Sequence, residues 1–231
     1  MDTAWIYMAM TNYPYPTKFL APLPGWPVAE SCKPFANVHD EQLNDEDRFK
    51  YLLRAARESI SVYYNSTGQV KCFDLSGGET PDVDMSGWNA LACNEMVMPM
   101  STDGVNDMFL PQEWDEKAYT EMCENDYGLT PQYDWALTYF GGRQPELDFM
   151  YATNIVFANG DLDPWNAGSV MEEVSKRSVV VNIEDAAHHL DLRLPNEEDP
   201  ESVVKARELE KSEIRKWLQE YNEKRSKSAL A

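Results

Sequence analysis

Two short stretches near the carboxyl end decide the fold: ATNIVFANG at residues 152–160 and SVVVNIE at residues 178–184. Each is a continuous apolar run rich in β-branched residues, which is typical of a parallel strand buried on both faces. The segment between them, residues 167–177, can form a short crossover helix. A last helix begins at Asp199, with Pro200 in the favoured first helical position. Strand, helix, strand, helix predicts an α/β protein with a parallel sheet.

Two strands alone do not make a stable parallel sheet, because each strand needs neighbours at its hydrogen-bonding edges. We therefore expect the rest of the sheet to lie outside residues 1–231. The first ten residues, MDTAWIYMAM, carry an acid at position 2 and an apolar stretch too short for a signal peptide or a membrane span. Either the protein is cytosolic or its beginning lies upstream, and we favour the second interpretation.

The residues before the strands are of a different kind, mostly helical and rich in loops. Residues 12–27 hold five prolines among aromatic side chains, which force extended or turn conformations. Such a segment usually packs over another surface. A helix follows through residues 46–64, with an apolar stripe and a cap at Asn44 or Asp45.

Charge and cysteine content limit the classes of function. With 40 acidic and 20 basic residues the net charge is −20, which repels nucleic acid and anionic membranes. No C-x-x-C pair occurs, so a zinc ribbon is not expected, and four cysteines admit two disulfides. Asn65 begins a glycosylation sequon, which favours disulfides and a secretory origin in the same way. The alternative is free buried thiols and an unused sequon.

Two loops carry candidate catalytic groups. NGDLDPW places Asp163 shortly after the first strand, with Pro164 fixing the backbone behind it, and AHHLDL places His188 after the second strand. Because the carboxyl ends of parallel strands meet at one edge, both loops emerge together. An aspartate so placed can orient a histidine that takes a proton from a serine, and the order Ser, Asp, His is that of α/β-hydrolases.

Several alternatives remain open from the residues alone. The Asp-Pro pair could belong to an ordinary turn, and the two histidines could be structural. Asp161 and His189 are rival candidates for the two roles. No G-x-S-x-G nucleophile elbow occurs in the chain, and the nearest similar stretches, STGQ and LSGGE, follow no predicted strand.

Five stretches closely resemble the carboxyl-terminal half of the prolyl carboxypeptidase and dipeptidyl peptidase II family of lysosomal serine peptidases. They occur in the family's order over nearly the whole chain: NYPYPTKFLAPLP, CNEMVMPMSTDGVNDMF, NIVFANGDLDPW, AHHLDLR and DPESVVKARELE. The resemblance implies the carboxyl-terminal part of an α/β-hydrolase fold at residues 149–231. Residues 1–148 would be part of a mostly helical, disulfide-bonded cap.

The resemblance also implies roles for single residues. It assigns Asp163 and His188 to the catalytic triad. It implies a pocket for proline that is lined by Trp88, Met98 and Trp165, and two indoles and a thioether suit a flat, apolar pyrrolidine ring. The alternative is that these three residues are plain core.

The remaining implications concern modification and assembly. By resemblance, Cys32 pairs with Cys72 and Cys93 with Cys123, and a homodimer can form. The sequon predicts that Asn65 carries a glycan. The protein would be lysosomal or secreted and would need no metal or cofactor. Ser101 departs from the family pattern, in which prolyl carboxypeptidase has a cysteine.

The sequence therefore predicts part of a serine exopeptidase that cleaves peptide bonds after proline. We expect residues 1–231 alone to be inactive, because the nucleophile would lie upstream. GQVKC and VMPM favour a carboxypeptidase, whereas DPESVVKARELE favours a dipeptidyl peptidase. The alternative from another class is a non-catalytic peptide-binding module.

Overall fold

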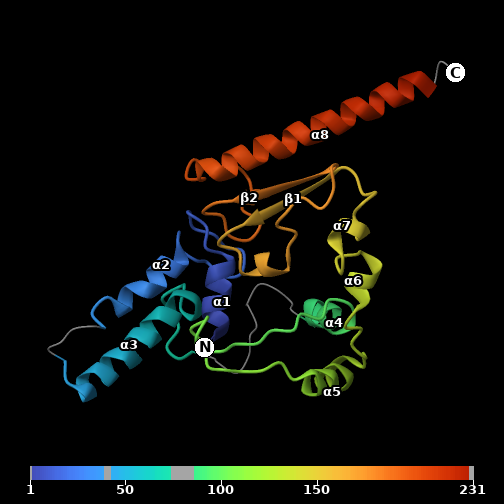
Figure 1. The fold of residues 1–231 in the computed structure, drawn as a ribbon. Helices are drawn as coiled ribbons and strands as arrows, with labels where there is room; N and C mark the ends of the chain where they lie inside the picture. Colours follow the sequence, from blue (N-terminus) through green and yellow to red (C-terminus); the bar gives the residue numbers. More distant parts are fainter. Residues whose placement is uncertain (1, 39–42, 74–85, 229–231) are drawn as a thin grey trace. The chain divides into compact units, whose positions relative to one another are not determined.

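The computed structural model describes residues 2–38, 43–73 and 86–228 (Figure 1). In chain order the elements are α1 (Asp2–Met10), α2 (Pro27–Cys32), η1 (Lys33–Phe35), α3 (Asp45–Tyr64), α4 (Ser86–Asn94), α5 (Glu116–Tyr127), α6 (Trp135–Tyr139), α7 (Pro145–Asp148), β1 (Ile155–Gly160), η2 (Pro164–Gly168), β2 (Ser178–Ile183) and α8 (Glu201–Ser228). The chain divides into two compact units. The first comprises residues 3–78 and 151–231, and the second comprises residues 79–150.

The two predicted strands are confirmed, with the first shifted by two residues from the expected 153–158. β1 and β2 pair in parallel from Ile155 opposite Ser178 to Gly160 opposite Ile183. Within the described residues they form a two-stranded sheet. Both arrowheads point the same way in Figure 1, so the loops that follow the strands leave the sheet at one edge.

The predicted crossover helix at residues 167–177 is wrong. The connection consists of the short 3-10 helix η2 followed by turns. Asn159 on β1 donates a side-chain hydrogen bond to the carbonyl of Val170 at 2.8 Å. Asn182 on β2 donates one to the carbonyl of Met171 at 3.2 Å. These carbonyls would accept backbone hydrogen bonds if the segment were helical. Here they accept side-chain hydrogen bonds from the strands, which hold the connection against the sheet.

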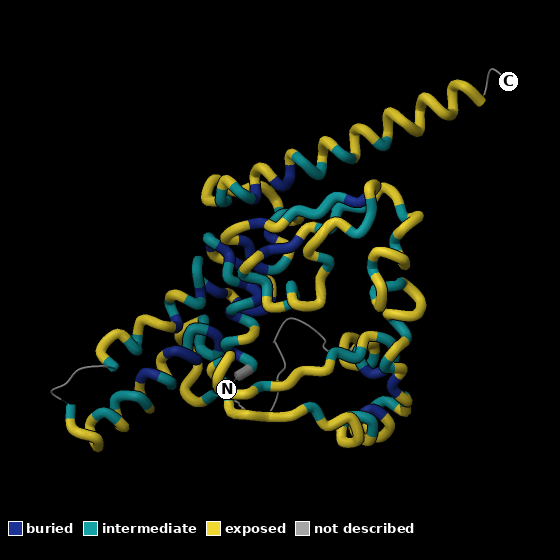
Figure 2. The backbone as a smooth tube through the Cα atoms, in the orientation of Figure 1, coloured by how far each residue is buried: buried dark blue, intermediate teal, exposed yellow. Residues whose placement is uncertain are grey.

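The predicted last helix is confirmed, and α8 begins at Glu201, two residues after the expected start at Asp199. It covers the sheet with its first turns only. Figure 2 shows the buried residues of α8 close to its amino end and mostly exposed residues beyond. A buried cluster joins this helix to the loop after β2 and to the proline-rich segment: Tyr13, Tyr15, Ile183, Ala186, Ala187, Leu190, Val203 and Ala206. Among the described helices, none is long and apolar enough to cross a membrane.

Arg207 fastens α8 to the loop after β2. Its guanidinium pairs with the buried Asp199 carboxylate at 2.6 Å. The same group donates to the carbonyl of Leu190 at 2.9 Å and to that of Asp191 at 2.7 Å. The buried guanidinium is compensated as long as all three partners are present. Removing one member of the ion pair leaves the other charge buried and unpaired, which lowers the free energy of unfolding.

We expect Arg207→Met to lower the free energy of unfolding by about 3–5 kcal/mol, because the Asp199 carboxylate would be left buried without its cation. Lys205→Met is the matched control, since Lys205 makes only an exposed ion pair with Glu201 on the same helix, and it should cost less than about 1 kcal/mol. Urea unfolding of both variants measures the difference. Equal losses would contradict the role given to Arg207.

A second buried cluster lies between α1, α3 and the proline-rich segment. Its members are Ala4, Met8, Met10, Leu20, Ala21, Leu23, Ile60 and Tyr63. The predicted α3 is confirmed, and Asn44 caps it by accepting a hydrogen bond from the Asp47 N–H. The proline-rich segment closes on itself through paired backbone hydrogen bonds between Thr17 and Leu23. As expected, it packs over other elements.

The predicted division of the chain at residue 148 lies close to the boundary between the two units at residue 150. The first unit, however, also contains residues 3–78, which pack with residues 151–231. Assignment of residues 1–148 to a cap remains a prediction. In the second unit Cys93 on α4 is joined to Cys123 on α5, so this disulfide is confirmed.

The other predicted disulfide is wrong for this structure, because Cys32 and Cys72 are free and exposed. The segment that holds the first thiol is tied to Tyr51 through the carbonyl of Pro34. Next to the second thiol, the Phe73 ring stacks on Tyr64. These two points on α3 are about 20 Å apart along the helix, whereas disulfide-bonded Cα atoms lie within about 7 Å.

Asn65, the predicted glycosylation site, is the carboxyl-terminal cap residue of α3. Its side-chain oxygen accepts a hydrogen bond from the Val70 N–H at 2.7 Å. The residue is partly exposed, and its modification stays a prediction.

Candidate functional site

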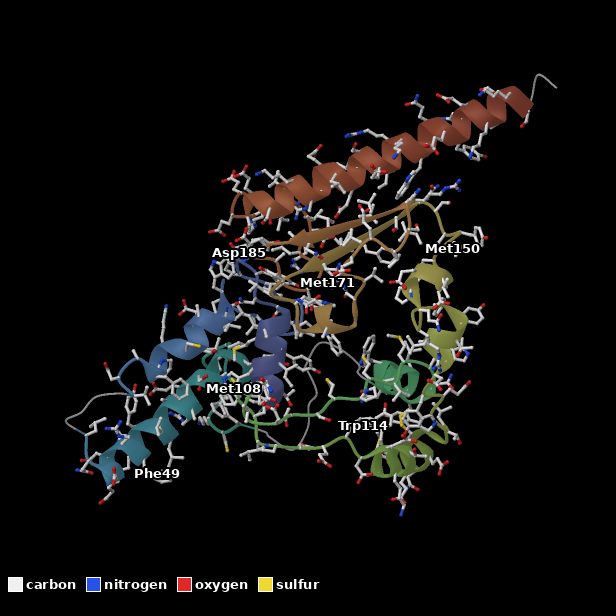
Figure 3. All side chains as sticks on the ribbon, viewed as in Figure 1. Phe49, Met108, Trp114, Met150, Met171 and Asp185 are labelled. Carbon is white, nitrogen blue, oxygen red and sulfur yellow. A yellow bond between two sulfur atoms is a disulfide. The ribbon has the colours of Figure 1, made fainter. Side chains whose placement is uncertain are left out.

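The site lies on the two loops that leave the carboxyl edge of the sheet. Asp163 follows β1 and His188 follows β2, and Nδ1 of His188 lies 2.8 Å from Oδ2 of Asp163. Their side chains are 18% and 13% exposed for His188 and Asp163 respectively. Asp185, labelled in Figure 3, marks the start of the second loop. The structure brings the two predicted residues into contact, and their catalytic role stays a prediction.

The Asp163 carboxylate is held by both of its oxygens. While Oδ2 faces the imidazole, Oδ1 accepts a hydrogen bond from the Trp165 N–H at 2.9 Å and caps η2. Pro164 takes the first position of η2, where its missing N–H is not needed. The carboxylate therefore keeps one direction, as a group that orients a histidine must.

A close approach of backbones holds the two loops together. A Cβ at Gly160 would lie only 2.2 Å from the carbonyl oxygen of Ala186, so a larger residue would push the loops apart. The same carbonyl accepts a hydrogen bond from the Leu162 N–H at 3.0 Å. Glycine at the end of β1 is thus required for the geometry of the site.

The rival residues occupy different environments. The Asp161 carboxylate approaches the Ala186 N–H at 3.4 Å rather than an imidazole. The His189 ring stacks on the His188 ring with centroids 3.6 Å apart. Burial lowers the pKa of His189, and the neighbouring His188 lowers it further, so folding favours the neutral ring. The geometry therefore favours Asp163 and His188 over their rivals.

The backbone of His188 is bound from the amino-terminal segment. Its N–H donates to the carbonyl of Met10 at 3.2 Å, and its carbonyl accepts from the Tyr13 hydroxyl at 2.6 Å. Sequence reasoning missed these contacts. The proline-rich, aromatic segment was expected to pack over another surface. The sequence did not indicate that this surface is the loop that carries His188.

A cavity of about 250 Å³ opens beside the pair, between β1 and the amino-terminal half of α8. Asp163, His189, Asp191 and Glu210 all line it. Burial, together with the nearby Asp191 charge, raises the pKa of Glu210 to about 7. The carboxyl of Glu210 is thus protonated in mildly acidic solution, where it adds no charge beside Asp191 and Asp163.

Glu210→Gln should stabilise the protein at pH 8 and change little at pH 4. The folded-state pKa of Glu210 lies above its ordinary value of 4.5. The contribution of Glu210 to stability is therefore complete when the pH is below 4.5, and it is lost as the pH rises to about 7. The gain at pH 8 should be about 1 kcal/mol, reduced by the partial exposure of this side chain.

Urea unfolding at both pH values measures this gain. Glu220→Gln, at an exposed position of the same helix, is the control and should have no effect at either pH. A destabilised Glu210→Gln at pH 8 would contradict the assignment.

The residues predicted to bind proline lie in different units. Trp165 is partly buried against the cluster around α1, and its indole N–H points to the sulfur of Met10 at 3.1 Å. Trp88 on α4 is 42% exposed, and Met98 in the segment after α4 is partly buried. Both belong to the second unit. A shared pocket of these three residues stays a prediction.

The arrangement suits proton transfer to and from a hydroxyl nucleophile. A histidine whose Nδ1 faces a fixed carboxylate presents its Nε2 as a base, and the carboxylate stabilises the cation that forms. In the described part of the chain, no group of three or more His, Cys, Asp or Glu residues is placed to hold a metal ion.

Comparison with known proteins shows which proteins this chain is similar to. The model of the family described as serine carboxypeptidase S28 matches residues 2–210. The lysosomal Pro-X carboxypeptidase of Mus musculus is 41% identical over 217 residues, which cover 94% of this chain and 42% of that protein. Its Homo sapiens counterpart is 40% identical over 221 residues, which cover 96% of this chain and 42% of that protein. The prolyl carboxy peptidase like protein 5 of Caenorhabditis elegans is 34% identical over 227 residues, covering 92% and 43%. The chain thus spans less than half the length of these relatives.

Proposed function

Because the chain belongs to the serine carboxypeptidase S28 family, whose fold is α/β-hydrolase-like, we propose that it supplies the acid-base half of a serine exopeptidase. The observation that carries this proposal is the contact of 2.8 Å between Asp163 and His188 at the carboxyl ends of two adjacent parallel strands. The serine nucleophile would come from sequence outside residues 1–231, in which no G-x-S-x-G elbow occurs.

Each residue has a defined role in the proposed mechanism. His188 takes the proton of the serine hydroxyl through Nε2 while the serine oxygen attacks the scissile carbonyl. The same nitrogen then gives this proton to the leaving amine. Asp163 accepts the Nδ1–H, keeps the imidazole in the required tautomer and stabilises the imidazolium. Both groups are mostly buried, which strengthens their interaction relative to water.

The proposed substrates are peptides with a proline before the scissile bond. The mouse and human relatives named as Pro-X carboxypeptidases support this choice. Trp165, Trp88 and Met98 are the proposed contacts of the proline ring, since aromatic faces and a thioether bind an apolar ring without hydrogen-bond donors. A carboxypeptidase would release the residue that follows the proline.

An acidic compartment is the proposed place of action. The relatives' names include the word lysosomal. At the pH of a lysosome Glu210 would be protonated, which removes one charge from the acidic surroundings of the site. Partial protonation of the acidic residues would also reduce self-repulsion in a chain with a net charge of −20.

Substitution of the pair tests the mechanism in a protein that includes the serine elbow. Asp163→Asn and His188→Ala should each lower kcat by about 10⁴-fold. Asp163→Asn keeps an oxygen that can still cap η2, so the loop should survive. The matched controls, Asp161→Asn and His189→Asn, should lower kcat by less than about tenfold, and asparagine tolerates the left-handed backbone at position 189.

The substrate panel separates the competing functions. An amino-blocked dipeptide of Pro-X type reports carboxypeptidase activity, and a dipeptidyl amide that ends in proline reports dipeptidyl peptidase activity. Equal losses at Asp161 and Asp163 would show that the wrong carboxylate was chosen. A folded protein with the elbow that cleaves neither substrate would favour a peptide-binding module.

A further inference from the structure

The peptide bond between His188 and His189 lies in a conformation that needs support. His189 has a φ of 58°, in the left-handed region that a residue with a Cβ adopts at a cost. The carbonyl of His188 belongs to this peptide and accepts the hydroxyl of Tyr13 at 2.6 Å, across 175 positions of sequence. Displacement of this peptide would move the Cα of His188, to which both the carbonyl and the imidazole side chain are attached.

Tyr13 is itself held rigidly. It is 1% exposed and belongs to the cluster that packs under α8. Its carbonyl accepts a hydrogen bond from the Trp26 N–H at 2.7 Å. The guanidinium of Arg193 lies 4.4 Å from the centre of its ring and donates to the Thr17 hydroxyl at 3.1 Å. The Tyr13 hydroxyl is thus a fixed donor at the end of a buried ring.

Met10, three residues before Tyr13, contacts both loops of the site. Its carbonyl accepts the His188 N–H at 3.2 Å, and its sulfur accepts the indole N–H of Trp165 at 3.1 Å. Trp165 in turn donates its backbone N–H to Asp163. The segment from Met10 to Tyr13 therefore contacts both the loop that carries Asp163 and the loop that carries His188, and it fixes their relative position.

We propose that Tyr13 is a positioning residue for His188: its hydroxyl fixes the His188–His189 peptide so that Nδ1 of His188 stays aligned with Asp163. Tyr13 touches no reacting atom and acts through this peptide. The effect on catalysis rests on the proposed function, whereas the effect on the imidazole does not.

Tyr15 offers a matched control two residues away. Its ring stacks on that of Tyr13 with centroids 6.3 Å apart, and it is 7% exposed. In the described structure the buried Tyr15 hydroxyl has no hydrogen-bond partner. Replacing either tyrosine with phenylalanine removes one buried hydroxyl from the same cluster, but only Tyr13→Phe removes a bond to the histidine loop.

The first measurement is proton NMR of the chain labelled with nitrogen-15 histidine. A proton on Nδ1 that is shared with a carboxylate gives a low-field line, which is assigned by its loss in His188→Gln. Tyr13→Phe should broaden this line or shift it toward higher field, and Tyr15→Phe should leave it unchanged. An unchanged line in a folded Tyr13→Phe chain would overturn the proposal.

The second measurement is kinetic, in a protein that includes the serine elbow. Tyr13→Phe should lower kcat by roughly 10- to 100-fold with little change in KM, as expected for a misplaced catalytic base. Tyr15→Phe should stay within about twofold of the parent. A fall in kcat that is equal in both variants would overturn the proposal, because it would reflect only the loss of a buried hydroxyl.

The outcomes separate this proposal from the proposed function. If His188→Ala leaves activity intact, the proposed function fails, and the NMR line still decides the role of Tyr13. If Tyr13→Phe does not fold, 4-aminophenylalanine at this position keeps a donor in the same place. That variant should fold and retain the low-field line, and loss of the line in this folded variant would overturn the proposal.

Discussion

The parallel pairing of β1 with β2 is the constraint on which the candidate site depends. Parallel strands end at the same edge, so the loops that carry Asp163 and His188 must leave the sheet side by side. Gly160 lets these loops approach closely because any side chain there would meet the carbonyl of Ala186. Both carboxylate oxygens of Asp163 are then used, one toward the imidazole and one toward its own loop.

The loops receive further support from elements far away in sequence. Arg207 binds two carbonyls of the histidine loop from α8. Met10 and Tyr13 bind the backbone of His188 from the opposite end of the chain. A residue that exchanges protons must keep its orientation to within a fraction of an ångström. The packing of α8 and of the proline-rich segment would therefore serve the proposed chemistry as well as the stability of the first unit.

Two titrating groups beside the pair respond to pH in opposite directions. Burial lowers the pKa of His189, so its contribution to stability grows as the pH rises. Burial raises the pKa of Glu210 to about 7, so its contribution is largest in acid. A protonated Glu210 and a neutral His189 add no charge near the carboxylate that faces His188.

The sequence by itself determined the local elements, and left the choice of the candidate pair to the resemblance. Apolar β-branched runs, Asn44 as a helix cap and the Asp-Pro turn are short-range signals, and they predicted both strands, α3 and the loop of Asp163. The resemblance selected Asp163 and His188 from their rivals, and the structure places these two in contact.

Tertiary structure decided what depends on contacts between distant residues. The segment at residues 167–177 has a sequence compatible with a helix, but asparagines on the strands bind its carbonyls and exclude one. The segments that hold Cys32 and Cys72 contact α3 at Tyr51 and at Tyr64, two distant points that the spacing of the cysteines in sequence does not reveal. The support of His188 by Tyr13 was equally invisible, because a hydroxyl and a carbonyl 175 positions apart meet only after the chain has folded.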